Sequence, residues 1–447
     1  MRDLFLVVYV LGLLPVVLRW PHVGILLWAW ISYMNPHRLS WGFAFDFRFA
    51  MVIGAAVIIG WLVSRERKSV PGDPITVLII ALAVWVSITT VFALAPERAE
   101  MKWDRTIKIL LLTVFTIVLM QSRERLHALI WVIVLSVGYY ATKGGFFTLL
   151  GGSEFRVFGP PKSFLADNNS LALAVIMVIP LMRYLQLHSA VPWIRLALLG
   201  AIPLSLLCLI GTHSRGALVG GTAMLIGLAI KSRRRGLILC IGAAAAIFAL
   251  AFTPQHWIDR MKSIADYEED SSAQGRFDAW TFAYKLSLDR PILGGGFLVQ
   301  TNEELFFRYV PDSPVVRSFH SIIFEVLGEH AWIGLFLFLA LLATGVIMCR
   351  MIERRTRGSP DLLWAKDLAG MLQVCFLGYF VTGLFQNLAF FDLYYHLLAL
   401  VAVTYALVRK ATPSPVTVRP QTAHQKALGL DAPVTEWASK PGRGAGP

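Results

Sequence analysis

Apolar residues run along most of this chain in long blocks, which short polar segments separate. A helix needs about 20 mostly apolar residues to cross the hydrocarbon core of a bilayer, within a range of roughly 17 to 25. On that scale the pattern predicts an all-α, polytopic membrane protein of about 12 transmembrane helices. The predicted spans lie near residues 4–19, 22–36, 49–64, 75–95, 106–120, 126–150, 168–187, 193–212, 214–230, 236–252, 319–349, 366–386 and 391–408.

The N-terminal pair of segments leaves this count open between about 12 and 13 spans. Arg19-Trp20-Pro21-His22 is either a turn between two spans or a break within one re-entrant hairpin. The apolar run from Leu4 to Leu18 continues into further apolar segments and lacks a convincing small-residue cleavage site. We therefore expect the first segment to be retained and not cleaved as a signal peptide.

One long polar interruption, residues 253–318, stands out between the apolar blocks. Within it, Gln274-Gly275-Arg276 opens a segment in which Phe277, Trp280, Tyr284 and Leu288 have the spacing of one helical face. Such a helix can lie on a membrane surface, and an ordered insertion of this size usually covers or builds a site. The interpretation divides the chain into an N-terminal transmembrane bundle (1–252), a periplasmic loop forming the roof of an active site (253–318), C-terminal transmembrane helices (319–410) and a disordered cytoplasmic tail (411–447).

Composition agrees with a membrane protein and excludes an ordinary soluble domain. Hydrophobic residues make up 56% of the chain and charged residues 15%, and the mean hydropathy is +0.63. The net charge of +13 comes from Lys and Arg in short clusters between apolar blocks, a pattern that is typical of topology signals and not of nucleic-acid binding. The four cysteines lie inside apolar runs and are interpreted as packing residues.

The basic clusters also predict an orientation. If they face the cytoplasm, then residues 96–105, 151–167, the Thr212 to Arg215 turn, the 253–318 loop and the 387–390 turn face the other side. In a bacterium this places the protein in the inner membrane, surrounded by membrane lipids, with its polar features in the periplasm.

Two of these polar features lie before the long loop. Arg156 precedes Asp167-Asn168-Asn169, where the aspartate or an asparagine can cap the next helix and leave its positive end facing a site. The second feature is the turn His213-Ser214-Arg215-Gly216. An arginine at membrane depth costs about 2.5 to 3.5 kcal/mol, so it usually pairs or serves a function. Arg215 suits a bidentate grip on a phosphate, although snorkelling to the headgroups is the alternative.

The other two features are Arg276 and His320. Arg276 is either a solvated residue of an amphipathic helix or part of a site. His320 has Arg317 three residues before it and Glu325 five after it. A neutral imidazole can take a proton from a sugar hydroxyl while nearby arginines hold an anionic leaving group. The plainer interpretation of His320 is a polar cap or a contact with lipid headgroups. The acidic run 266–270 is interpreted as a solvated turn, so we expect a reaction that uses no metal and no cofactor.

In order along the chain, these motifs resemble the bacterial O-antigen ligase superfamily. The resemblance rests on Arg156 to Gly159 with Asn168 and Asn169, His213-Ser214-Arg215-Gly216, Gly275-Arg276 with Trp280, and His320 with Glu325, Gly328 and Gly334. Tyr33-Met-Asn-Pro-His-Arg38 and Lys143-Gly-Gly-Phe-Phe resemble the O-glycosylation ligases associated with the exosortase system. The family often has His-Asn at the catalytic histidine, whereas this chain has His320-Ser321 and, further on, Glu329-His330.

The resemblance implies a membrane glycosyltransferase of the GT-C type that moves a glycan from undecaprenyl pyrophosphate to an acceptor hydroxyl, for the ligases the sugar core of lipid A. His320 is then expected to be the general base, with Arg215 and Arg276 holding the pyrophosphate, and a single displacement should invert the anomeric centre. Arg156, Arg317 and Asn168 are expected to support donor binding.

Three alternatives remain. A protein O-oligosaccharyltransferase would use a serine or threonine acceptor, and an O-antigen polymerase would use another lipid-linked glycan. A lipid or polysaccharide transporter would spread its polar residues along several spans, whereas here they gather on one face, and no internal repeat supports it.

Overall fold

The computed structural model describes residues 2–66, 68–151, 155–232, 235, 236, 240, 242 and 271–412. Every regular element within these residues is helical, so the all-α prediction is confirmed for this part of the chain. The α-helices are α1 (Arg2–Arg19), α2 (Pro21–Met34), α3 (Phe49–Val63), α4 (Pro74–Val91), α5 (Pro96–Leu119), α6 (Arg123–Leu150), α7 (Asn168–His188), α8 (Pro192–Gly211), α9 (Arg215–Lys231), α12 (Ser271–Asp289), α13 (Glu303–Tyr309), α14 (Ile322–Arg355), α15 (Leu363–Gly383) and α16 (Asp392–Ala411). Short 3₁₀ helices are η1 (Pro36–Leu39), η2 (Phe43–Asp46), η3 (Val299–Thr301) and η4 (Pro360–Leu362).

Each predicted span except 236–252 coincides with one of these helices; most of 236–252, the acidic run 266–270 and the tail beyond Thr412 lie outside the described residues. Among the described helices, α4, α6, α7, α8 and α14 are long and apolar enough to cross a membrane. They indicate a multi-pass membrane protein. Cys208, Cys349 and Cys375 are buried as packing residues, but Cys240 is exposed, contrary to the expectation for all four.

The segment 96–105, predicted as a connection between spans, is instead the first part of α5. Its proline, Pro96, takes the first helical turn, where the missing N–H costs nothing, and Glu97 lies beside the positive end of the helix dipole. Lys102 and Arg105, two of the charged residues of this segment, therefore project from a helix. This correction matters because both residues line a cavity described below.

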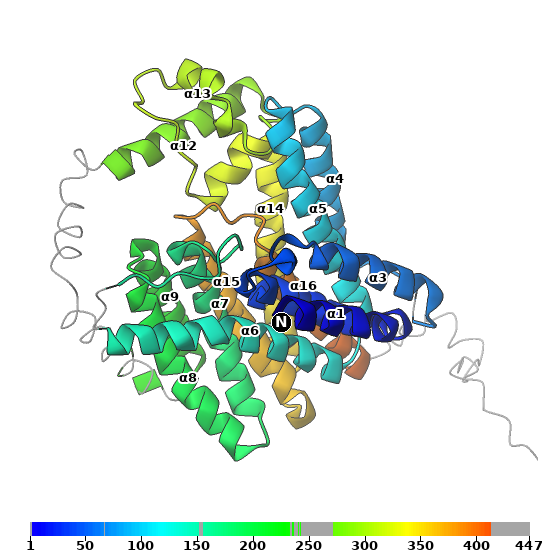
Figure 1. Cartoon of the computed structure of the whole chain (residues 1–447). Helices are drawn as coiled ribbons and strands as arrows, with labels where there is room; N and C mark the ends of the chain where they lie inside the picture. The colour runs from blue at the N-terminus through cyan, green and yellow to red at the C-terminus, as the bar shows by residue number, and fades with distance from the viewer. Residues whose placement is uncertain are drawn as a thin grey trace, which may run out of the picture.

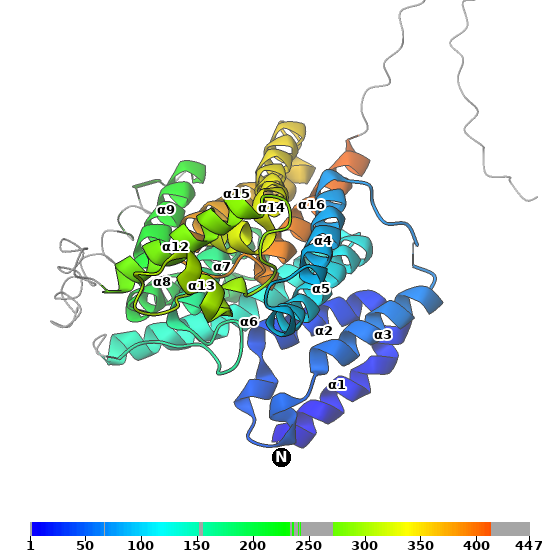
Figure 2. The same cartoon turned by 90° about the horizontal axis from the view of Figure 1, so that it is seen from above.

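The core of the protein is built around α7, α15 and α16. Nearly every side chain of α7 from Leu171 to Met182, and of α16 from Leu393 to Val403, is buried. Figures 1 and 2 show the other helices arranged around this centre, with α1, α2 and α3 grouped on one side and α6, α8 and α9 on another. Where α6 meets α8, a Cβ on Gly145 would lie 2.0 Å from the Leu204 carbonyl oxygen, so only glycine permits this approach.

The helices α12 and α13 lie together at one end of the bundle, beside the start of α14 (Figure 1). The buried side of α12 is formed by Ala279, Phe282, Ala283 and Leu286, which pack with Phe306 and Phe319. The face predicted from the sequence is different: Phe277, Tyr284 and Leu288 are 47%, 48% and 54% exposed. The helix therefore has two apolar stripes, and tertiary packing covers the one that the sequence spacing did not single out.

The long helix α14 changes direction at Ala331, whose φ of 53° and ψ of −157° are non-helical. The carbonyl groups of Gly328 and Glu329 accept hydrogen bonds from the backbone N–H groups of Gly295 (3.0 Å) and Gly296 (2.8 Å). These bonds satisfy backbone acceptors near the break that would otherwise be buried without partners. The kink thus holds the part of α14 before Ala331, which carries Glu325, Glu329 and His330, against the loop after α12.

Candidate functional site

His320 stands two residues before α14 in a left-handed backbone conformation, with φ at 45°. This conformation is unfavourable for a residue with a Cβ, so the surroundings must hold it. The backbone N–H of His320 donates to Asn387 Oδ1 at 2.7 Å, and the indole N–H of Trp280 donates to the carbonyl of Phe319 at 2.7 Å. Two elements distant in sequence, α12 and the turn after α15, therefore fix the histidine.

Arg276 and Arg317 lie on the α12 side of His320. The side chain of Arg317 packs against Gly275, where an added Cβ would meet its Cγ at 2.8 Å. Burial lowers the pKa of His320, and the nearby positive charge of Arg276 lowers it further; Arg317 acts in the same direction. Asp167 and Glu325 partly oppose these effects. A half-buried imidazole with a lowered pKa is neutral near pH 7, which is the form that can accept a proton.

Arg215 is the first residue of α9, directly after its N-cap Ser214, whose hydroxyl accepts from the N–H of Ala217 at 3.1 Å. The turn before it is tied to two other segments. Asn168 is buried at the start of α7 and its amide donates to the Thr212 carbonyl at 2.7 Å, while Asp167, and not an asparagine, caps α7. The N–H of Val157 donates to the Gly211 carbonyl at 2.9 Å.

This bond places the exposed residue Arg156 next to the turn that leads into Arg215. Asp167 connects the two halves of the site, because it caps α7 and its charge also acts on His320. The structure thus brings Asn168 and Arg156 to the Arg215 turn, and Arg276 and Arg317 to His320.

A buried ion cluster lies at the start of α14, the helix that follows His320. Lys102 Nζ on α5 donates to Glu325 Oε1 at 2.7 Å and to both carboxylate oxygens of Glu329 at 2.8 and 2.9 Å. The second oxygen of Glu325 accepts from the N–H of Ala389 at 3.0 Å, and Glu329 accepts from the N–H of Leu298 at 2.9 Å. The cluster therefore joins α5, α14, the loop after α12 and the 387–390 turn that carries Asn387.

The sequence interpretation missed Lys102 and Asn387. Glu325 and Glu329 gave a usable signal, because carboxylates at i and i+4 share one helix face and repel unless a cation lies between them. The sequence alone does not reveal which cation this is, since Lys102 is 223 residues away from Glu325. Within the described residues no three His, Cys, Asp or Glu side chains converge as a metal site, but the run 266–270 is not among them, so the metal-free reaction stays a prediction.

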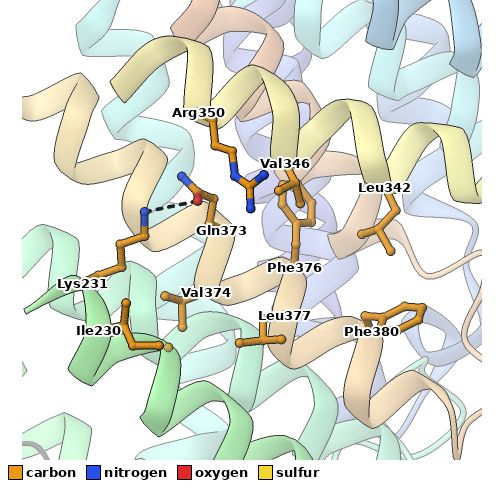
Figure 3. Close-up of a pocket in the computed structure, with 11 residues that line it drawn as sticks. Ile230, Lys231, Leu342, Val346, Arg350, Gln373, Val374, Phe376, Leu377 and Phe380 are labelled. Carbon is orange, nitrogen blue, oxygen red and sulfur yellow. Dashed lines mark hydrogen bonds between the residues drawn. The ribbon is translucent and has the colours of Figure 1, made fainter. Parts of the chain in front are cut away.

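A separate groove lies between α9, α14 and α15, with a volume of about 410 Å³ (Figure 3). Its walls are mainly apolar, from Leu342, Val346 and Phe380, and its polar end carries Lys231, which donates to Gln373 Oε1 at 3.2 Å. Lys231 is the last residue of α9 and Arg215 is the first, so the polar end of the groove and Arg215 lie at opposite ends of this helix. None of the predicted site residues lines this groove.

Two known families match the two regions of the chain that contribute residues to the site. Residues 200–339 match the O-Antigen ligase family, and residues 1–190 match a family of unknown function (DUF5935). Residues 200–339 form an O-antigen ligase domain. The predicted resemblance is therefore confirmed, and Arg215, Arg276 and His320 all lie inside this domain. The chain has no match among curated proteins.

The O-antigen ligase family implies an enzyme of the ligase or glycosyltransferase type whose substrates are lipid-linked glycans in general. The domain is not the whole site, however. Lys102, Arg156 and Asn168 come from the N-terminal region of unknown function, so this region supplies contacts to the O-antigen ligase domain.

Proposed function

We propose that this protein is a glycan ligase of the bacterial inner membrane, with about 12 spans and with its site facing the periplasm. The donor is a glycan on undecaprenyl pyrophosphate and the acceptor is a hydroxyl, for which a lipid A-core sugar is the first choice. The observation that carries the proposal is the position of His320 within an O-antigen ligase domain, held in a left-handed conformation with the charge of Arg276 beside it.

In the proposed reaction, the imidazole of His320 accepts the proton of the acceptor hydroxyl while the acceptor oxygen forms a bond to the anomeric carbon of the donor. The bond between that carbon and the pyrophosphate oxygen breaks, and undecaprenyl pyrophosphate leaves as an anion. Arg215 and Arg276 stabilise the negative charge of this leaving group, as fixed guanidinium groups can do without a metal. A single displacement inverts the anomeric centre.

The supporting residues act in two ways in this proposal. Arg317 and Arg156 add positive charge near the pyrophosphate, from the α12 side and from the side of the Arg215 turn. Asn168 sets the position of Arg215, because its amide holds the Thr212 carbonyl three residues before the arginine.

The test uses the purified full-length protein in lipid nanodiscs with an undecaprenyl-pyrophosphate-linked glycan. Three acceptors are offered separately: a lipid A-core, a serine- and threonine-containing peptide, and a second lipid-linked glycan. We expect transfer to the lipid A-core, and we expect His320→Ala to lower the rate about 10²- to 10⁴-fold. His22→Ala, another half-buried histidine, is the matched control and should transfer at the wild-type rate.

Transfer to the peptide or to the second glycan would instead identify a protein O-oligosaccharyltransferase or a polymerase with the same donor. Wild-type turnover in His320→Ala would contradict the assigned base. Movement of the intact lipid-linked glycan across the bilayer, without transfer, would identify a transporter.

A further inference from the structure

A second polar cavity lies on the α5 side of His320. It has a volume of about 430 Å³, and it is lined by residues of α5, η3, the loop before α7, the start of α14 and the 387–390 turn. Ser318, two residues before His320, lines the cavity. Asn387, which accepts the hydrogen bond from the backbone N–H of His320, also lines it. A ligand in the cavity would therefore lie next to the segment that carries the proposed base.

One wall of the cavity contains a hydrogen-bond acceptor that lacks a donor. Gln300 is only 6% exposed, and its Oε1 atom has no partner among the described residues. A buried amide oxygen without a hydrogen bond is unfavourable, so such a group is usually satisfied by a ligand or a water molecule. The hydroxyl group of a saccharide is a donor of the right kind.

Arg105 supplies the second feature. Its guanidinium lies 3.1 Å above the centre of the Phe164 ring, and within the described part of the chain it makes no ion pair or hydrogen bond. A guanidinium stacked on a ring keeps its N–H donors in the plane of the group, where they can bind a carboxylate or a phosphate in bidentate fashion. The buried Asp392 attracts Arg105 and Arg38 repels it, but within the residues that the structure describes neither forms an ion pair or hydrogen bond with it.

The other cation in the lining is already neutralised. Lys102 contacts two carboxylates, from Glu325 and Glu329, so it has little attraction left for an anion. Arg105 is therefore the residue that gives the cavity its preference for a negative group. The aromatic rings of Phe164 and Phe390 add apolar wall against which the face of a sugar ring can pack.

We propose that this cavity binds a saccharide that carries a phosphate or carboxylate group. Arg105 holds the anionic group and Gln300 Oε1 accepts from a sugar hydroxyl. We further propose, resting on the function proposed above, that this saccharide is the acceptor, which reaches His320 from the α5 side.

Binding is tested first without catalysis, on the full-length protein in nanodiscs by saturation-transfer NMR. The probes are glucose, glucose 6-phosphate, glucuronate and inorganic phosphate. We expect glucose 6-phosphate or glucuronate to bind about tenfold more tightly than glucose, because charge-assisted bonds are the stronger ones. Comparison of these two probes tells a phosphate site from a carboxylate site, and inorganic phosphate tells a saccharide site from a simple anion site.

The variants separate the two contacts. Arg105→Gln should remove the tighter binding of the anionic sugars and leave glucose binding unchanged. Arg105→Lys should keep part of the tighter binding of the anionic sugars. Gln300→Leu should weaken all three sugars and leave inorganic phosphate unaffected. Arg308→Gln is the matched control, because Arg308 is exposed on α13, pairs with Glu304 of the same helix and is not in the lining of the cavity.

Equal binding of glucose and the anionic sugars by the wild type, or inorganic phosphate binding as tightly as glucose 6-phosphate, would overturn the cavity proposal. So would unchanged binding in both Arg105→Gln and Gln300→Leu. In the transfer assay these two variants should raise the acceptor KM about tenfold and leave the donor KM unchanged.

The two proposals fail in different ways. His320→Ala should lose transfer but keep sugar binding. If transfer is confirmed but the cavity variants leave the acceptor KM unchanged, the acceptor assignment is wrong and the proposed function stands. If the wild type transfers no glycan but binds anionic sugars through Arg105, the proposed function is wrong and the saccharide site stands.

Discussion

Replacing Lys102 by methionine tests whether the buried ion cluster holds the site together. Methionine keeps much of the side-chain length and removes the charge, so the carboxylates of Glu325 and Glu329 lose the cation between them. Their side chains are 3% and 0% exposed, and each keeps only one backbone donor, from Ala389 and Leu298. We expect Lys102→Met to destabilise the folded protein markedly.

The expected magnitude follows from this burial. Removing one partner of a buried ion pair leaves an uncompensated charge and costs about 3 to 5 kcal/mol. The same substitution at Lys108, on the same helix, removes an exposed pair with Asp104 whose side chains are 42% and 56% exposed. Exposed pairs of this kind contribute about 0.3 to 0.5 kcal/mol, so Lys108→Met is a matched control that should change little.

The assay is thermal unfolding of the purified protein in one detergent, followed by tryptophan fluorescence. Lys102→Met should lower the midpoint by about 3 to 5 °C, and Lys108→Met by about 0.5 °C or less. The double variant Lys102→Met with Glu329→Gln should recover part of the loss, because the amide oxygen can still accept from Leu298 while one buried charge is gone. Equal midpoints for the two lysine variants, or a double variant less stable than Lys102→Met, would refute this reasoning.

Three further predictions concern the reaction. Because the neutral imidazole of His320 is the active form and burial with Arg276 holds its pKa below the usual 6.5, kcat/KM should fall to half of its plateau only at a pH below 6.5. A half-maximal point above pH 6.5 would contradict the lowered pKa. Arg215→Lys should weaken binding of undecaprenyl pyrophosphate about tenfold although the charge is kept, and unchanged affinity would favour headgroup snorkelling. Ligation should proceed at nearly its normal rate in excess EDTA, and a large loss that Mg²⁺ or Mn²⁺ restores would exclude the metal-free mechanism.

Local signals in the sequence predicted most of the helices and their order. Apolar blocks of membrane-spanning length, the proline and serine or aspartate residues at helix starts, and the family motifs around Arg215 and His320 are all local signals. A local pattern also predicted the helix that begins near Arg276. It did not predict which of its two apolar faces is buried, because both have helical spacing and only the neighbours Phe306 and Phe319 decide between them.

The tertiary structure decided what surrounds the histidine. Lys102 meets Glu325 and Glu329 across 223 and 227 residues of chain, and Asn387 holds His320 across 67. Hydrophobic periodicity says which face of a helix is buried but not which helix it meets, so it cannot pair these residues. The kink at Ala331 likewise depends on groups from outside the helix. The N–H groups of Gly295 and Gly296 satisfy the carbonyls of Gly328 and Glu329, and the indole N–H of Trp85 satisfies that of His330.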